Sequence, residues 1–207
     1  MSKSILVVQS YDAGFDRVAD VCCRSVAKYC QAQGHSYLRH RGTMPYVEHP
    51  SWSKIVLAAA MLPQYDYVWS VDADIFIYDL STRLDGWLDD RFDISICRDG
   101  PDSTEPYRFN AGSVLWRNTD WTKAFLQMLL THANGPQPTT WEQAFMQDYA
   151  GSSQINRRIQ VWPHNSFNHD GGEFVIHLCN STVLENKLEF LRNSLAMKGL
   201  SCDAIFE

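Results

Sequence analysis

The amino-acid sequence predicts an α/β fold with a mixed, mostly parallel central sheet flanked by helices, similar to a Rossmann-type sheet. The chain opens with a strand over residues 4–9, a helix over 16–33 and a second strand over 35–40. This order is typical of the start of a parallel sheet. A further apolar strand over residues 67–77 carries an Asp-Ala-Asp triplet in its middle. Apolar runs and helical patterns continue to alternate after it, as the α/β class requires.

Periodicity and capping residues set the expected boundaries of the elements. The first helix has an apolar stripe from Val18 to Cys30 and ends at Gly34, which suits a helix C-terminus. The next expected elements are a helix at 51–62 capped by Ser51 or Ser53 and stopped by Pro63, a short helix at 80–89, a strand at 93–97, a polar loop at 98–108, a strand at 114–116, a helix from Thr119, a helix from Thr140 to about Tyr149, strands at 159–162 and 174–178, and a C-terminal helix capped by Ser181 or Thr182.

Composition and charge exclude several classes of partner. The 207 residues, 45% of them hydrophobic, fit one domain, residues 1–207, with a sizeable core. A formal net charge of −6 argues against nucleic acid or an anionic membrane surface as the main partner. The longest apolar run, residues 55–62, is too short for a transmembrane segment, and residues 1–4 leave no room for a signal peptide. The six cysteines form no Cys-x-x-Cys pair, so we expect reduced thiols and a cytoplasmic location.

Asp72 and Asp74 are the leading candidates for a metal site. In an extended chain alternate residues share a face, so both carboxylates are expected on one side, with Ala73 turned away. Two carboxylates this close repel each other unless a cation neutralises them, and oxygen ligands suit a hard divalent ion. An Asp-x-Asp pattern alone also marks turns and solvated edges. The apolar residues on both sides of this one favour the metal interpretation.

Two further stretches are expected near a ligand because they adjoin strand ends. In parallel sheets ligands bind beyond the carboxyl ends of strands, which places Gln9, Tyr11 and Asp12 close to one. Tyr11 is a candidate for stacking on a base, with a packed turn aromatic as the alternative. Gly112 indicates close approach of a backbone or a ligand.

Lys54 and His177 each allow a structural and a functional interpretation. Lys54 lies in the first turn of its helix, where it gains nothing from the helix dipole, so it either serves a ligand anion or is a solvated lysine. His177 lies within an apolar strand, where a histidine is costly unless it is hydrogen-bonded or coordinated. It is therefore either a satisfied core histidine or a metal ligand.

Five sequence blocks in this order resemble the GT-A-fold glycosyltransferases, and most closely the galactosyl/xylosyltransferase group, glycosyltransferase family 34. The blocks are Trp52-Ser53-Lys54, residues 67–77, FNAGSVLWRN at 109–118, WEQAF at 141–145 and VIHLCN at 175–180. The likeness covers most of the chain. The sequence also resembles the compact glycosyltransferase domains that large algal viruses use on their capsid protein.

The resemblance implies metal-dependent, retaining transfer of a sugar from a nucleotide donor, usually a UDP-sugar, to a glycan or glycoprotein, with Mn²⁺ or Mg²⁺. It places Asp72, Asp74 and His177 on the metal ligands of the family. It also places Asn110, Gly112 and Ser113 on the donor-sugar loop, and Glu142-Gln143 on the acid-glutamine pair that faces the reacting sugar. The donor is thus expected to meet Gln9, Tyr11, Asp12, Lys54, Asp72, Ala73, Asn110, Gly112 and Ser113.

The chain departs from the family in two respects. It shows no amino-terminal membrane anchor, so a secretory-pathway location is not expected. The basic residue that commonly follows the metal histidine by a few positions is missing from residues 179–182. Lys54 or an arginine elsewhere is expected to cover the diphosphate, or the ion alone carries that charge.

Glu142 is the leading candidate for the carboxylate that supports the oxocarbenium-like transition state, and Asp170 is the second. A capping box at Thr140-Trp141-Glu142-Gln143 is the alternative role for these polar residues. Three other functions remain open. A haloacid-dehalogenase-type phosphatase also has an Asp-x-Asp, but normally on its first strand. A sugar nucleotidyltransferase needs a glycine-rich loop after the first strand, where only Gly14 is present. The third is a non-catalytic sugar-nucleotide-binding module.

Overall fold

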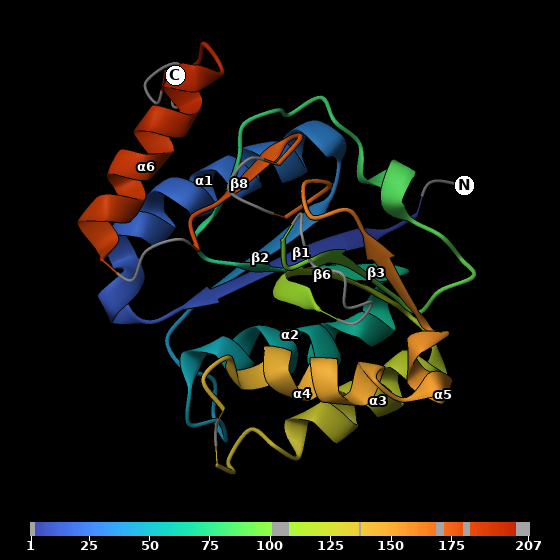
Figure 1. Cartoon of the computed structure of the whole chain (residues 1–207). Helices are drawn as coiled ribbons and strands as arrows, with labels where there is room; N and C mark the ends of the chain where they lie inside the picture. The colour runs from blue at the N-terminus through green and yellow to red at the C-terminus, as the bar shows by residue number, and fades with distance from the viewer. Residues whose placement is uncertain (1–2, 101–107, 137, 169–171, 180–182, 202–207) are drawn as a thin grey trace.

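The computed structural model describes residues 3–100, 108–136, 138–168, 172–179 and 183–201. Within these ranges the chain forms three layers, with a central sheet between two sets of helices (Figure 1). The predicted α/β class with a mixed, mostly parallel sheet is confirmed. Several predicted features lie outside the described residues, namely Asp170, Ser181, Thr182 and residues 101–107 of the polar loop.

The described part of the main sheet has six strands in the order β2-β1-β3-β6-β5-β7. Their bounds are β1 (Ile5–Tyr11), β2 (Ser36–Arg41), β3 (Tyr67–Asp72), β5 (Ile94–Arg98), β6 (Phe109–Arg117) and β7 (Ile159–Trp162). β1 pairs in parallel with both β2 and β3, and β5 pairs in parallel with β7. β6 is antiparallel to its neighbours β3 and β5, so its first residues lie where β3 ends.

Helices cover both faces of the sheet because the central strands are apolar on both sides. α2 (Ser53–Met61), α3 (Asp120–Leu130), α4 (Trp141–Ala150) and the short α5 (Ser153–Asn156) lie on one face, and α1 (Asp16–Gln33) and α6 (Leu184–Met197) lie on the other (Figure 1). Along β1, Leu6 and Val8 belong to the core on the α2 side, whereas Ile5 and Val7 belong to the opposite core. Such two-sided burial is typical of a covered sheet.

The predicted strand over residues 67–77 is in fact two strands that belong to different sheets. β3 ends at Asp72, the chain turns at Ala73 and Asp74, and β4 (Ile75–Ile77) then pairs antiparallel with β8 (Val175–His177). Because β4 leaves the main sheet, β8 is not a strand of that sheet either. β4 and β8 are fully buried and mainly apolar, as are the strands of the main sheet, so their composition alone did not indicate which sheet they join.

Other boundaries show where local signals succeed and fail. Gly34 ends α1 in the left-handed conformation, as predicted, and Thr119 caps α3 by accepting from the Thr122 N–H. The predicted helix at 80–89 is a single 3-10 turn, Leu84–Trp87. The predicted strand at 114–116 begins earlier, at Phe109. The capping box at Thr140 is absent, since its side chain makes no cap hydrogen bond.

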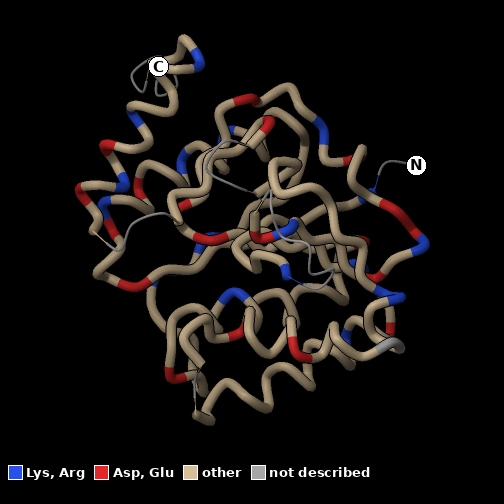
Figure 2. The backbone as a smooth tube through the Cα atoms, viewed as in Figure 1, with Lys and Arg blue, Asp and Glu red and all other residues tan. Residues whose placement is uncertain are grey.

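The helix predicted at 51–62 begins with a 3-10 turn, Pro50–Trp52, that His49 caps by accepting from the Ser51 N–H. Neither serine acts as the predicted N-cap of α2, and the Ser53 hydroxyl instead accepts from the Met44 N–H. Lys and Arg are interspersed with Asp and Glu along the described backbone (Figure 2). Among the described helices, none is long and apolar enough to cross a membrane.

Candidate metal and nucleotide site

Three chain segments meet at one edge of the main sheet. β1 and β3 both end there, with Ser10 opposite Asp72, and β6 begins there, with Ser113 opposite Val71. The carboxyl ends of parallel strands are the usual place for ligands in such sheets. β4 and β8 extend from the same edge, so side chains from both sheets converge on it.

Asp72, Asp74 and His177 form a cluster whose ligand atoms all lie within 4.8 Å of one another. His177 Nε2 lies 3.3 Å from Asp74 Oδ1 and 3.6 Å from Asp72 Oδ2. The register of β4 and β8 sets this arrangement, because Ile75 is opposite His177 and the Leu178 N–H donates to the Asp74 carbonyl. The two carboxylates therefore converge through a turn and not through the strand alternation expected from the sequence.

The hydrogen bonds of His177 orient its ring so that the Nε2 atom faces the two carboxylates. Asn168 donates through Nδ2 to both oxygens of Asn110, at 3.2 Å to the carbonyl and 2.9 Å to Oδ1. Its own Oδ1 therefore faces His177 Nδ1, 2.7 Å away, and must accept a proton from it. In neutral His177 the remaining lone pair is on Nε2, which is the tautomer that a metal ligand needs.

The surroundings of the cluster keep both carboxylates ionised. Burial alone would raise the pKa of the Asp74 carboxyl, but His177 and Lys187 outweigh it and hold that pKa well below its usual range. Burial would also raise the pKa of the Asp72 carboxyl, but Lys54 and His177 outweigh it and lower this pKa. Burial would lower the pKa of His177, yet Asp74 and the hydrogen bonds to both carboxylates raise it well above its ordinary value. Two carboxylates and one imidazole suit Mn²⁺.

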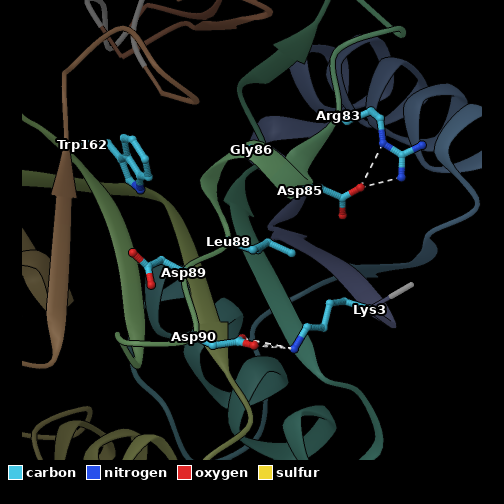
Figure 3. Close-up of a pocket in the computed structure, with 8 residues that line it drawn as sticks. All are labelled: Lys3, Arg83, Asp85, Gly86, Leu88, Asp89, Asp90 and Trp162. Carbon is cyan, nitrogen blue, oxygen red and sulfur yellow. Dashed lines mark hydrogen bonds and ion pairs between the residues drawn. The ribbon is translucent and has the colours of Figure 1, made fainter. Parts of the chain in front are cut away.

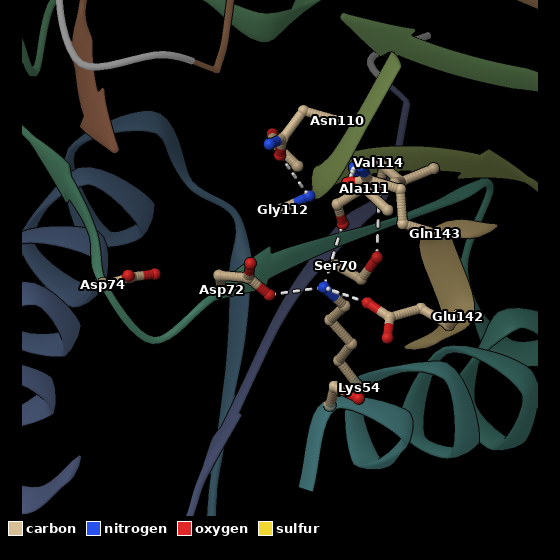
Figure 4. A network of polar contacts seen from close by, with 12 residues as sticks. Lys54, Ser70, Asp72, Asp74, Asn110, Ala111, Gly112, Val114, Glu142 and Gln143 are labelled. Atoms are coloured by element: carbon tan, nitrogen blue, oxygen red, sulfur yellow. Dashed lines mark hydrogen bonds and ion pairs between the residues drawn. The ribbon is translucent and has the colours of Figure 1, made fainter. Parts of the chain in front are cut away.

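Each aspartate also contacts a buried lysine through its other oxygen. Lys54 Nζ contacts Asp72 Oδ1, lies 2.9 Å from Glu142 Oε1 and donates to the Ala111 carbonyl at 2.9 Å (Figure 4). Lys187, on α6, donates to Asp74 Oδ2 at 2.8 Å. The lysines thus hold both carboxylates with their remaining oxygens toward His177.

Gly112 lies directly against this cluster. A Cβ atom at this position would lie far inside van der Waals contact of His177 Cε1, and 2.8 Å from Asn110 Oδ1. It would also lie 2.9 Å from Asp72 Oδ2. The close approach expected from the sequence is therefore an approach of the β6 backbone to the metal-ligand candidates.

A cavity of about 350 Å³ opens beside the two aspartates. It is lined by Ser10, Tyr11, Asp12, Phe15, His49, Pro50, Ser51, Lys54, Asp72, Ala73, Asp74 and Trp141. Five predicted donor-binding residues are among these, namely Tyr11, Asp12, Lys54, Asp72 and Ala73. Tyr11 is held from outside the cavity by Arg39, whose guanidinium donates to the phenol oxygen at 2.8 Å through Nε. A smaller cavity next to it includes Asn110, Asn168 and His177 in its wall.

The other predicted residues lie behind the walls of the larger cavity. Gln9 is buried and donates to the Asp72 carbonyl at 2.9 Å, so it holds the end of β3. Ser113 is buried and accepts from the Trp69 indole at 2.7 Å. Gln143 accepts from the Ala111 N–H at 2.9 Å, and Glu142 is buried against Lys54.

Glu142 nevertheless has an unusual feature. Its Oε2 atom is buried and has no hydrogen-bond partner in the described structure, although a buried carboxylate oxygen normally has one. Glu142 does not line the larger cavity, so a ligand there would reach this oxygen only through a movement of the cavity wall.

Sequence reasoning missed Lys187 and Asn168. Lys187 lies on the amphipathic helix α6 and contacts a residue 113 positions earlier, so no local pattern marks it. Asn168 lies between the strands predicted at 159–162 and 174–178, nine positions before His177, and no sequence pattern there marks it.

A second cavity of about 470 Å³ lies elsewhere, lined by Lys3, Arg83, Asp85, Gly86, Leu88, Asp89, Asp90 and Trp162 (Figure 3). Its charged groups are paired with one another, Lys3 with Asp90 at 2.8 Å and Arg83 with Asp85. These are exposed ion pairs, and among the described residues the candidate metal ligands cluster at the first cavity and not at this one.

Comparison with known proteins agrees with this geometry. Residues 15–195 match the family model described as Nucleotide-diphospho-sugar transferase. The chain belongs to this family. The family implies a nucleotide-sugar donor and sugar transfer, so the glycosyltransferase class expected from the sequence is confirmed. No curated protein matches the chain.

Solved structures share the fold of this nucleotide-diphospho-sugar transferase. A glycosyltransferase involved in glycosylation of the major capsid of PBCV-1 has a TM-score of 0.72 at 13% identity, covering 91% of this chain and 98% of its own. GlyE of Streptococcus pneumoniae TIGR4 has a TM-score of 0.62 at 13% identity, covering 99% of this chain and 62% of its own. The galactosyltransferase LgtC, with donor and acceptor sugar analogs, has a TM-score of 0.51 at 12% identity, covering 89% and 94%. The resemblance to GT-A glycosyltransferases is confirmed at the level of the fold.

Proposed function

We propose that this transferase is metal-dependent, that its donor is a UDP-sugar and that its acceptor is a glycan or glycoprotein. The observation that carries the proposal is the Asp72-Asp74-His177 cluster at the wall of the larger cavity. The tautomer of neutral His177, the two carboxylate oxygens that face His177 and the missing Cβ of Gly112 support a divalent ion among these three side chains. When bound, Mn²⁺ or Mg²⁺ neutralises the diphosphate leaving group as the glycosidic bond breaks.

The side chains around the cavity suggest how the donor lies. Tyr11 and Asp12, at the end of β1, are placed to hold the nucleoside. Asp72, Ala73 and Asp74 bring the diphosphate close to the metal ligands. Lys54 lies between this part of the cavity and Glu142, so the transferred sugar is expected near that pair. Lys187 joins α6 to the metal cluster, which supports one functional domain over residues 1–207.

We further propose that Glu142 and Gln143 act on the reacting sugar and that the configuration at the anomeric carbon is retained. Retention rests on the resemblance to family 34. The unpartnered Glu142 Oε2 supports a role toward the sugar, and Asp170, outside the described residues, is the second candidate. The five described cysteines are not joined to one another by disulfides, which agrees with the proposed reducing, cytoplasmic location.

Metal-dependent donor binding is the first prediction. We expect the dissociation constant of UDP, measured by calorimetry, to be at least about tenfold lower with Mn²⁺ than with excess chelator. Mn²⁺ should be more effective than Mg²⁺ because an imidazole is among the ligands. Equal UDP affinity with Mn²⁺ and with chelator would contradict the proposed function.

Glu142→Gln is the second prediction. Its amide oxygen can still accept from Lys54, so the fold should survive, but the negative charge is lost. We expect kcat to fall by about a hundredfold and the donor KM to change little, because the charge acts on the transition state. Release of UDP from a panel of UDP-sugars measures both. A variant with a small loss of stability and unchanged turnover would transfer the role to Asp170.

A further inference from the structure

A stacked aromatic pair with one exposed ring lines the larger cavity. The rings of His49 and Trp141 are stacked, with centroids 4.1 Å apart and an interplanar angle of 13°. Both residues line the cavity, on segments far apart in the sequence. Trp141 is 37% exposed and is the one tryptophan among the large hydrophobic side chains exposed in the described structure. A flat apolar surface thus borders the cavity and remains open to solvent.

The backbone at Trp141 is strained in a way that keeps this surface open. Its φ is +44°, a left-handed conformation that is costly for a bulky residue. The residue begins α4, and the next residue, Glu142, points inward to Lys54. The conformation therefore sends the indole to the cavity mouth while the following side chain enters the interior. Strain of this kind persists where the surrounding structure requires it, often at functional sites.

His49 is the less exposed ring of the pair, and its neighbours in the chain hold it in place. Its Nδ1 accepts from the Ser51 N–H at 3.2 Å, so the proton of the neutral ring is on Nε2. Burial lowers the pKa of His49, which favours the neutral ring as a partner for the indole. Pro50 follows directly and fixes the chain at the start of the 3-10 turn. The platform is therefore ordered before any ligand arrives.

We propose that the His49–Trp141 pair is the platform on which the acceptor binds, and that it receives the apolar face of a pyranose ring. This inference rests on the proposed function. A pyranose presents several C–H groups on one face and hydroxyls at its rim, so it packs on an aromatic ring and keeps its polar groups in water. Because Trp141 adjoins Glu142, a sugar on the platform lies next to the expected position of the donor sugar.

The two aromatic walls of the cavity differ in a way that favours this assignment over a nucleobase. Tyr11 is only 5% exposed and lies at the end of β1, which suits an enclosed base. The Trp141 side is open to solvent, which suits an acceptor that extends out of the cavity as a longer glycan or as part of a glycoprotein.

The test uses Trp141→Asn, because asparagine tolerates a left-handed φ and removes the aromatic ring. Tyr46→Asn is the matched control, since Tyr46 is also an aromatic residue with positive φ, is 91% exposed and does not line the cavity. Trp141→Phe retains an aromatic surface.

The probes are methyl β-glucoside, methyl β-galactoside and methyl β-xyloside, and their binding is measured by saturation-transfer NMR with and without UDP and Mn²⁺. Calorimetry with UDP and Mn²⁺ accompanies each variant.

We expect saturation transfer from the wild-type protein to the ring C–H protons of at least one glycoside. This signal should fall about tenfold in Trp141→Asn, partly recover in Trp141→Phe and stay unchanged in Tyr46→Asn. The UDP dissociation constant should stay within about twofold in all variants.

Three results would overturn the platform: no signal with any of the glycosides in the wild type, an unchanged signal in Trp141→Asn, or a large loss of UDP affinity in that variant. The last would show that the pair holds the nucleobase. Failure of the proposed function has a different signature, namely no metal-dependent UDP binding in any protein, the wild type included.

Discussion

Gly112→Ala is expected to weaken metal binding strongly at the Asp72-Asp74-His177 cluster. The added methyl would overlap His177 Cε1 and lie 2.9 Å from Asp72 Oδ2, so both ligand candidates must move. Among the described glycines the left-handed ones are Gly34, Gly42 and Gly199, so the effect at Gly112 is steric and not conformational. We expect Mn²⁺ affinity to fall by about a hundredfold and the free energy of unfolding by about 1–3 kcal/mol.

The measurements are titration of Mn²⁺ by its electron paramagnetic resonance signal and unfolding in urea. Gly86→Ala is the matched control, because a Cβ there meets nothing within 4 Å and the backbone is not left-handed. It should leave both quantities unchanged. A Gly112→Ala protein that loses stability but keeps its Mn²⁺ affinity would place the metal elsewhere.

The sequence predicted the fold class well because the central strands and the main helices carry strong local patterns. Apolar runs indicate the strands β1 and β3. A stripe of apolar residues at helical spacing and a C-terminal glycine indicate α1. The prediction of strand boundaries failed where one sequence pattern is compatible with two different structures. β3 and β4 form one apolar run, and the turn at Ala73 and Asp74 is visible only through the pairing of β4 with β8.

The clustering of Asp72, Asp74 and His177 was expected from the short motif that holds the two aspartates and, for His177, from the resemblance to the family. Their supporting partners were not. The contacts of Lys54 with Glu142 and of Lys187 with Asp74 join elements that are distant in sequence. A hydropathy pattern tells which side chains are buried and gives no information about which element they face. Lys54 was therefore expected to be either solvated or ligand-binding, whereas it is buried between two carboxylates.

This burial makes Lys54→Met the substitution with the largest expected loss of stability. Lys54 is 3% exposed and contacts Asp72, Glu142 and the Ala111 carbonyl. Methionine fills similar space but leaves the buried Glu142 and the 34% exposed Asp72 without the ammonium group that lies between them. Removing one partner of a buried ion pair typically costs about 3–5 kcal/mol, and we expect a loss of this size in the free energy of unfolding at pH 7.

The pH dependence of this loss follows from the pKa of Asp72. Burial would raise this pKa, but Lys54 outweighs burial and lowers it. A carboxyl whose pKa is lower in the folded than in the unfolded protein stabilises the fold at pH values above its unfolded-state pKa. That stabilisation disappears as the pH falls through its folded-state pKa. The difference between wild type and Lys54→Met should therefore be largest near neutral pH and shrink below about pH 4.

Urea unfolding at several pH values measures this difference, with Lys3→Met as the control. Lys3 also pairs with an aspartate, Asp90, at 2.8 Å, but its side chain is 41% exposed, so its removal should cost about 0–1 kcal/mol. Adding Glu142→Gln to Lys54→Met removes one of the two uncompensated charges and should restore part of the loss. A Lys54→Met protein as stable as the Lys3→Met control at pH 7 would show that the buried triad carries no net electrostatic stabilisation.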